Sequence, residues 1–309
     1  SMWVKNTMPD AIGQNPLWSA SPAADNNNYY GIYLGSDELR YHNANPSTTQ
    51  INGDAKLRDP NGWYHILTKV DINTARCYIN GEAWGGSFTL NGGWWNNTSY
   101  RMMIGSQSIS GGESGAVYAG YTYSQVYHID GQAFGPHKFG FTDPLTGVWT
   151  PKKLTSVNDG TVYSNYLTSN TTINAPTSAF DGLPGNSAYT DPGNPTTIVF
   201  TPPKPIPVTS TIEIRSYGSY ASGAQSAVLN DGEASVSMTI GYWATLYGPS
   251  TPTEIRKIEL TATGASAQAG LAAIRVDGEI LKDNTTEVAF GTNGFYLPMN
   301  DDDYIGKDF

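Results

Sequence analysis

The chain has 309 residues with a formal net charge of −10, and its residues are 39% apolar, 12% aromatic and only 14% charged. This length allows one large β domain or two of ordinary size, and the apolar content is sufficient for a folded core. The acidic charge, with no Lys/Arg cluster, argues against nucleic-acid binding, and no apolar run approaches the about 18 residues of a membrane-spanning helix.

The 34 Gly and 19 Pro residues, with many Asn, Ser and Thr, indicate an all-β protein with long loops. Short β-prone runs between turn residues predict strands nearly throughout, and helical periods longer than about two turns are absent. The expected strands are Met2–Asn6, Leu17–Ser19, Tyr29–Leu34, Glu38–His42, Trp63–Val70, Ala75–Asn80, Tyr100–Ile104, Tyr118–Ile129, Thr197–Phe200, Thr211–Ser216, Gln225–Asn230, Ala234–Met238, Trp243–Leu246, Glu254–Ala262, Ala272–Val276 and Glu279–Leu281.

The clearest hairpin joins the strands Trp63–Val70 and Ala75–Asn80. Apolar and polar residues alternate in the second strand, which predicts one buried and one wet face, and Asn80-Gly81 is typical of a tight reversal. The single cysteine excludes an internal disulfide, as is usual for folding in a reducing cytoplasm. We expect a structural role, in the core or at its margin, for Trp63, His65, Leu67, Cys77 and Ile79.

A domain boundary is expected near Thr155, where the turn-rich "DPLTGVWTPKKLTSVNDGT" precedes an Ala-, Ser- and Thr-rich region. The later block "EVAFGTNGFYLPM" returns to the aromatic and Gly-rich composition of the first region. The sequence therefore predicts one domain from residues 1–155 plus 288–309 and a second, inserted domain from residues 156–287. Val288–Leu297 should form a strand that pairs with, or packs on, residues before 156. The first two residues are typical of an expression scar, and we expect a fragment of a longer protein.

Three pieces of the first region, in order, are "WVKN", "GWYHILTKVD…ARCYINGE" and "MMIGSQ…YAGYTYSQVYHIDGQAF". Together they resemble the laminin-G and concanavalin-like lectin/glucanase jelly rolls, from Trp3 to Phe134. The resemblance implies an antiparallel jelly-roll sandwich.

Two further phrases, "IDGQAFGPHKFGFTDPLTGVWTPKKLT" and "GTNGFYLPMNDDDYIGKDF", resemble a module of tailed bacteriophage structural proteins, notably of marine and cyanobacterial phages. In that module the first phrase runs almost directly into the second, whereas a long segment separates them here. This departure supports the insertion. The resemblance implies a virion component from a fibre, an appendage or a capsid decoration, and the insertion leaves open whether the role of the shorter relatives is retained.

The inserted region resembles the galactose-binding-like sandwiches of discoidin domains and carbohydrate-binding modules, through "NAPTSAFDGLPGNSAYT" and "KIELTATG…LAAIRVDGEIL". The Thr and Trp of that family's opening motif are not matched, and Ser187 and Tyr189 fall nearest to them. The resemblance implies a structural calcium ion at Asp181. No other cofactor is indicated, and the sequence has no spaced calcium-loop motif.

Catalytic residue types are sparse, and no catalytic residue is assigned. A glycoside hydrolase needs two carboxylates about 5–9.5 Å apart, and no such pattern appears on one strand face. The four His residues show no metal-ligand spacing, and the terminal Asp301, Asp302 and Asp303 are typical of a solvated acidic run. The sequence therefore favours a protein that is not an enzyme.

Aromatic rings beside amide groups suit sugars, which present apolar faces together with hydroxyl groups. The alternative for each such residue is the sandwich core or a contact between domains. The candidate ligand-binding residues are Trp94, Trp95, Asn96 and Asn97 in the first domain, and Tyr217, Tyr220, Tyr242 and Trp243 in the second.

The sequence thus predicts a virion adhesion protein that is made in the host cytoplasm and acts outside the cell on a glycan or cell-surface polysaccharide. Its partners would be carbohydrate and other virion proteins, and the role admits a homo-oligomer. One alternative is an assembly module, which would hide its aromatic residues at an interface. The other is a polysaccharide-degrading enzyme, which would need two close carboxylates in a cleft.

Overall fold

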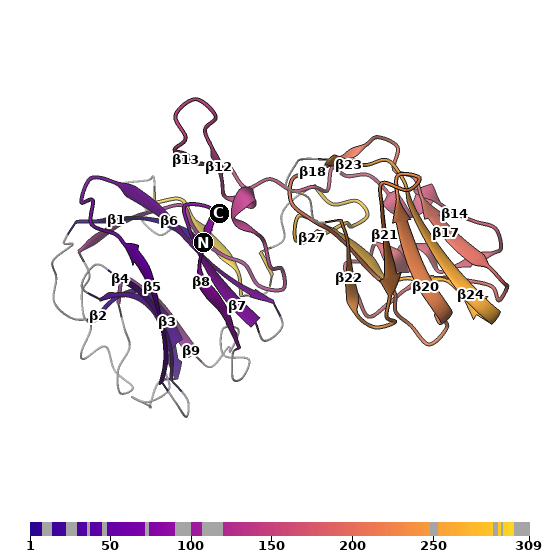
Figure 1. Ribbon diagram of the computed structural model, residues 1–309, viewed down its shortest axis with the longest axis horizontal. Helices are drawn as coiled ribbons and strands as arrows, with labels where there is room; N and C mark the ends of the chain where they lie inside the picture. The colour runs from indigo at the N-terminus through magenta and orange to yellow at the C-terminus, as the bar shows by residue number, and fades with distance from the viewer. Residues whose placement is uncertain are drawn as a thin grey trace. The chain divides into compact units, whose positions relative to one another are not determined.

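The computed structural model describes residues 1–7, 14–22, 30–35, 38–44, 48–71, 74–89, 100–106, 120–247, 253–286, 290–291 and 293–299. The chain divides into two compact units (Figure 1). The first unit comprises Ser1–Lys152 and Phe290–Phe309, and the second comprises Lys153–Ala289. The first unit is therefore built from two stretches of chain that flank the second. The boundaries expected from the sequence, 155/156 and 287/288, lie within three residues of these.

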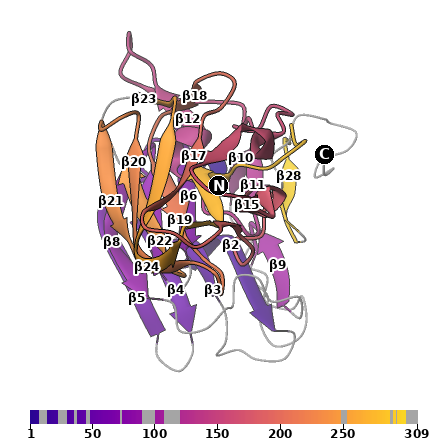
Figure 2. The ribbon, with the colours of Figure 1, turned by 90° about the vertical axis from the view of Figure 1, so that its right-hand side faces the viewer.

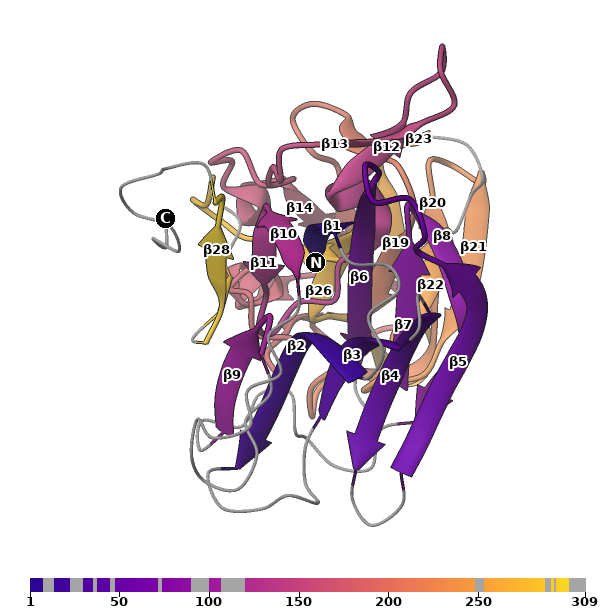
Figure 3. The same cartoon turned by 90° about the vertical axis from the view of Figure 1, so that its left-hand side faces the viewer.

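The first unit contains two five-stranded antiparallel sheets. One has the strand order β10-β1-β6-β7-β8, and the other has the order β5-β4-β3-β2-β9, whose strands are seen side by side in Figure 3. The strands of the first sheet are β1 Met2–Asn6, β6 Trp63–Asp71, β7 Thr74–Ile79, β8 Glu82–Thr89 and β10 Tyr121–Ser124. Those of the second are β2 Gln14–Pro22, β3 Tyr30–Gly35, β4 Glu38–Ala44, β5 Thr48–Lys56 and β9 Tyr100–Ile104.

The core of the first unit lies between these two sheets. Alternate residues of β1, β6 and β7 face it, because side chains alternate across a strand. Buried members from the first sheet include Val4, Ile66 and Cys77, and Trp18 and Ile32 are among those from the second. The all-β sandwich that the composition predicts is confirmed.

The outer face of the first sheet is covered by the segment that follows β11 Val126–His128, with η2 Pro136–Lys138 and the hairpin of β12 Gly140–Thr142 and β13 Trp149–Pro151. Trp149 lies against the Asn80-Gly81 turn, because a Cβ atom on Gly81 would lie 2.4 Å from its ring. Phe139 and Trp149 both contact the ring of His65. This covering explains why β6 is buried on both faces.

The expected places of the hairpin residues are confirmed with one exception. His65, Leu67 and Cys77 are buried, and Ile79 packs against the core. The prediction for Trp63 is wrong, because 42% of this residue is exposed. It is the first residue of β6 and pairs with Lys5, near the end of β1, so its side chain lies at the end of the sheet.

The first unit regains a strand from the end of the chain, β28 Phe295–Leu297, which pairs antiparallel with β11. Tyr296 stacks on Tyr127 with ring centroids 4.2 Å apart and an interplanar angle of 8°. Phe295 and Leu297 also pack against the core of the first unit. The expected return of the tail to residues before 156 is confirmed over these three residues.

The second unit is a separate antiparallel sandwich, with a five-stranded sheet in the order β14-β17-β24-β20-β21, four strands of which are labelled in Figure 2. Its second sheet has four strands in the order β22-β19-β26-β27. The five strands are β14 Leu167–Ser169, β17 Thr196–Phe200, β24 Ile258–Gln268, β20 Ser222–Leu229 and β21 Ala234–Met238. The four are β22 Trp243–Tyr247, β19 Ile212–Arg215, β26 Ala273–Val276 and β27 Glu279–Ile280.

Smaller elements complete the second unit, and its core is rich in Ile, Leu and Phe, with Phe180, Phe200 and Ile214 almost fully buried. These elements are β15 Ile173–Asn174, β16 Ala188–Thr190, β25 Gly270–Leu271, β18 Ile206–Val208, β23 Thr253–Ile255, η3 Tyr163–Tyr166 and η4 Pro176–Ala179. The proline-rich stretch supplies β18, which among the described strands pairs with β23 alone, as suits residues without ladder donors. Within the described residues, no helix is long and apolar enough to span a membrane.

Candidate functional site

The predicted ligand-binding residues fall into two groups. Trp94, Trp95, Asn96 and Asn97 lie outside the described residues. The other four lie in the second unit, on two neighbouring loops. Tyr217 and Tyr220 follow β19, Tyr242 precedes β22, and Trp243 is the first residue of β22.

A backbone hydrogen bond holds these two loops together. The amide of Gly241 donates to the carbonyl oxygen of Ser216 at 2.7 Å. Gly241 and Gly218 both have positive φ values, of 91° and 110°, which glycine adopts without strain. A Cβ atom on Gly218 would lie 2.5 Å from the hydroxyl oxygen of Ser187, so the first loop also packs closely on the segment before β16. Three parts of the chain that are distant in sequence therefore meet at one place.

The tyrosines on these loops are exposed. The exposed fractions are 38% for Tyr217, 51% for Tyr220 and 69% for Tyr242. Tyr220 stacks on Tyr189 of β16, with ring centroids 4.3 Å apart and an interplanar angle of 14°. None of these rings belongs to the hydrophobic core of the second unit. We call Tyr189, Tyr217, Tyr220, Tyr242 and Trp243 the aromatic patch.

Two arginines approach the aromatic patch from the outer face of the four-stranded sheet. The guanidinium carbon of Arg215 lies 5.2 Å from the ring centre of Tyr217, and that of Arg275 lies 4.4 Å from the ring centre of Trp243. Arg275 also donates two hydrogen bonds of 2.7 Å to the carboxylate of Glu213. Sequence reasoning missed both arginines, although the alternation in "TIEIRS" puts Glu213 and Arg215 on one face.

Asp181 fixes its own loop. One carboxylate oxygen accepts from the amide of Leu183 at 2.7 Å, and the other accepts from the side-chain amide of Asn186 at 2.7 Å. Over the described residues, no three His, Cys, Asp or Glu side chains gather as metal ligands. The arrangement does not fit a calcium site built from several carboxylates, since calcium takes about six to eight oxygen ligands.

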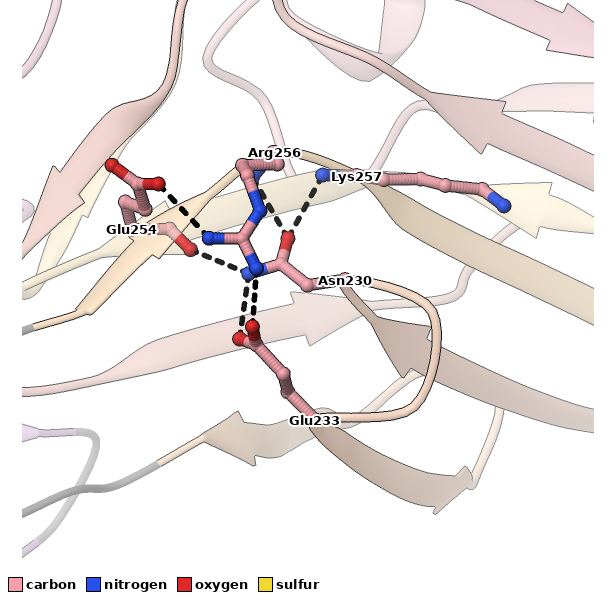
Figure 4. Close-up of polar contacts among 5 residues, drawn as sticks. All are labelled: Asn230, Glu233, Glu254, Arg256 and Lys257. Atoms are coloured by element: carbon pink, nitrogen blue, oxygen red, sulfur yellow. Dashed lines mark hydrogen bonds and ion pairs between the residues drawn. The ribbon is translucent and has the colours of Figure 1, made fainter.

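A second polar cluster, shown in Figure 4, joins the β20–β21 turn to the segment between β23 and β24. Asn230 donates to Glu233 and to the carbonyl oxygen of Glu254, both at 2.8 Å, and it accepts from the amides of Arg256 and Lys257 at 2.8 and 3.0 Å. The guanidinium of Arg256 bridges the carboxylates of Glu233 and Glu254. The hydrogen bond from Asn230, and then that from Arg256, lower the pKa of Glu233. A general acid needs the opposite shift.

The same cluster corrects one predicted strand. We expected a continuous strand over Glu254–Ala262, but the structure has β23 and β24 with Arg256 and Lys257 between them. Their two amides donate to Asn230 instead of to a neighbouring strand.

His65 of the first unit is fully buried beneath aromatic rings. Its Nε2 atom lies 2.9 Å from the hydroxyl oxygen of Ser1. Burial, and then the positive charge of the N-terminal amine, lower the pKa of His65 to about 3. A neutral, fully buried ring of this kind matches the structural role that the sequence suggests.

The two units define an all-β protein made of antiparallel sandwiches. Residues 1–121 match the family model of the concanavalin A-like lectin/glucanases superfamily. No curated protein sequence matches the chain.

Three solved structures are among those to which the chain is similar. The lectin domain of lectinolysin is 10% identical, with a TM-score of 0.29 and coverage of 38% of this chain and 92% of that one. The family 32 carbohydrate-binding module of NanJ from C. perfringens is 20% identical, with a TM-score of 0.25 and coverage of 37% and 94%. Domains LG4-5 of the mouse laminin alpha1 chain are 10% identical, with a TM-score of 0.25 and coverage of 96% and 73%.

Proposed function

We propose that this protein is a non-enzymatic adhesion component of a phage virion, and that the aromatic patch of its second unit contacts a glycan. The observation that carries the glycan contact is the exposure of Tyr217, Tyr220 and Tyr242 on two loops held by the Gly241–Ser216 hydrogen bond. Loops at the end of a rigid sandwich can present side chains to a partner without a packing duty. The lectin family match of residues 1–121 supports the same function.

The alternative of an assembly module fits the aromatic patch less well. An assembly module would bury such rings at an interface with another subunit, whereas the proposed glycan contact needs ring faces that stay accessible, as Tyr242 is in this chain at 69%. The ion pairs in the polar cluster around Asn230 support a function without catalysis. Glu233 and Glu254 are bridged by Arg256 and do not face each other across an open cleft.

The test is the retention of the protein on immobilised polysaccharides and on a glycan array. Tyr242→Ala and Tyr217→Ala should weaken binding by about twofold to tenfold, since a stacked aromatic ring contributes about 0.5–1.5 kcal/mol. Tyr166→Ala is the matched control, because Tyr166 is 37% exposed on η3, outside the aromatic patch. Each variant is also melted, so that loss of folding is separated from loss of binding.

If the parent protein is retained on no glycan, adhesion is contradicted and assembly becomes the better explanation. Equal losses in Tyr166→Ala and Tyr242→Ala would contradict the aromatic patch as the contact. Release of reducing sugar ends from a bound polysaccharide would contradict the non-enzymatic part of the proposal.

The sequence offers a second set of candidate glycan-binding residues in the first unit, namely Trp94 and Trp95 with the amides of Asn96 and Asn97. A Trp94→Ala or Trp95→Ala variant that folds normally but is no longer retained would assign binding to that loop as well. Unchanged retention of both variants would limit binding to the second unit.

The virion setting depends on the resemblance of "GVWTPKK" and "GTNGFYL" to phage structural proteins. We propose synthesis in the host cytoplasm and action outside the cell as part of the particle. Mass spectrometry of purified virions checks this setting, and absence of the protein from the particles would contradict it.

A further inference from the structure

Three arginines in the second unit can be compared for their carboxylate partners. Arg256 bridges Glu233 and Glu254, and Arg275 makes a two-bonded pair with Glu213. Arg215 has no carboxylate partner among the described residues. Its guanidinium instead lies over the ring of Tyr217. Its Nε atom is buried and lacks a hydrogen-bond partner within the described part of the chain.

An arginine in this state is costly without a ligand. The guanidinium stays charged at every relevant pH, and a buried donor that loses water without gaining an acceptor destabilises the structure. A planar carboxylate, or a sulfate, supplies two acceptor oxygens that match the guanidinium fork. The position of Arg215 against the exposed ring of Tyr217 would place such an anion beside an aromatic platform.

The charges around Arg215 also favour an anionic ligand. The protein as a whole is acidic, with a formal net charge of −10, and this charge repels polyanions. The two loops of the aromatic patch, residues 216–221 and 239–242, contain no acidic residue. Glu213, the nearest carboxylate on the same strand, is already paired with Arg275. On β19 and these two loops, the guanidinium of Arg215 is therefore the charged group without a counter-ion.

We propose that the aromatic patch selects acidic sugars, with Arg215 binding the carboxylate or sulfate of the sugar while an exposed tyrosine ring packs on its apolar face. This inference rests on the proposed glycan-binding function and names the class of glycan. Arg275 takes no part in recognising the anion, because Glu213 already occupies its hydrogen-bonding fork.

The experiment compares three sets of oligosaccharides by isothermal titration. Agarose fragments are neutral, κ-carrageenan fragments carry sulfate on a related galactan backbone, and polygalacturonate fragments carry carboxylate. The parent should bind one of the two acidic sets about tenfold more tightly than agarose fragments, and this preference should fall as salt is raised. The set that is preferred distinguishes sulfate from carboxylate.

Arg215→Gln should remove this preference, so that the variant binds the acidic fragments no more tightly than the neutral ones. Arg215→Lys, which keeps the charge but not the fork, should retain part of it. Lys204→Gln is the charge-matched control, because Lys204 is 69% exposed and pairs with Asp159 away from the aromatic patch. A thermal melt of each variant separates folding from binding.

Two results would overturn the proposal. One is a parent that binds neutral fragments as tightly as acidic ones. The other is Arg215→Gln with normal folding and an unchanged preference for the acidic set. If the parent still bound neutral glycans and Tyr242→Ala weakened that binding, the proposed glycan adhesion would hold and only the selection of acidic sugars would be contradicted. A parent that binds no glycan on an array would remove both.

Discussion

The indole of Trp149 stacks on the imidazole of His65, with ring centroids 5.9 Å apart and an interplanar angle of 21°. Trp3 and Phe139 contact the same imidazole, at centroid distances of 5.2 and 5.9 Å. The tryptophan of "GVW" therefore has a structural role in this chain, since its ring covers the outer face of the β6–β7 hairpin. His65 is enclosed as a neutral ring within this aromatic cluster.

Trp149→Ala should destabilise the first unit by about 2–4 kcal/mol, because it removes the ring that covers His65 and leaves a cavity. Trp63→Ala should cost about 1 kcal/mol or less, since 42% of Trp63 is exposed. Urea unfolding followed by tryptophan fluorescence measures both. A larger loss for Trp63→Ala than for Trp149→Ala would contradict this description of the hairpin's outer face.

Gly81→Ala and Gly131→Ala form a second matched pair. Both glycines have a positive φ, of 85° and 80°, so both variants share the backbone cost of about 1 kcal/mol. A Cβ atom at Gly81 meets the Trp149 ring, whereas one at Gly131 meets no atom within 4 Å. Gly81→Ala should therefore be the more destabilising by about 1–3 kcal/mol in thermal melts. Equal melting temperatures would mean that Trp149 does not lie against the turn.

Asn230→Ala should destabilise the second unit by about 2–4 kcal/mol, because it leaves two backbone amides and the carbonyl oxygen of Glu254 without their partner. Asn230 also has a φ of 45°, which Asn tolerates better than Ala. Arg256→Ala removes only two exposed ion pairs, to Glu233 and Glu254, and should cost about 0–1 kcal/mol. Denaturant melts of the second unit check this order, and the reverse order would show that the ion pairs, not Asn230, hold the turn.

Acidification should destabilise the first unit between pH 6.5 and about 3. Burial lowers the pKa of His65 to about 3 and that of His128 to about 4, from an ordinary value of 6.5. In this window the unfolded chain takes up protons that the folded chain does not, so stability falls as the pH falls, by up to about 1.4 kcal/mol per pH unit for each group. Burial of the Ser1 amine, whose pKa falls from 8.0 to about 5, acts in the same direction.

The measurement is calorimetry from pH 7.5 to 4.5 on the parent and on His65→Gln. The second unit contains no histidine, so its transition serves as an internal control and should move less. The variant should show a shallower dependence of the first unit's melting temperature on pH. Identical slopes in parent and variant would mean that folding does not lower the pKa of His65.

Local patterns were sufficient for the elements whose alternation is regular. The β6–β7 hairpin follows from alternating residues and an Asn-Gly turn, and the return of the tail follows from similar aromatic and Gly-rich stretches. β8 Glu82–Thr89 was missed because it contains Gly85 and Gly86, although Trp84 is buried in the core. Pairing with β7 decides that strand, not its own β propensity.

The candidate site could be predicted only in part. The tyrosines were found as aromatic residues in Gly-rich loops, but their exposure depends on how the loops pack. It could not be foreseen that Arg215 has no carboxylate partner within the described part of the chain. Glu213 is two residues away on the same strand face, yet it pairs with Arg275, which is 62 residues further along the chain, because β19 and β26 are aligned in register there.

The pairing of β11 with β28 also sets an order of events during synthesis. The whole second unit, Lys153–Ala289, is synthesised after β11 and before Phe295, so the two strands of this pair are made with a complete domain between them. Until that strand arrives, β11 has no strand partner among the described residues. The first unit therefore begins first and is completed last, and a released chain that ends after the second unit would contain one complete sandwich and one that lacks its last strand.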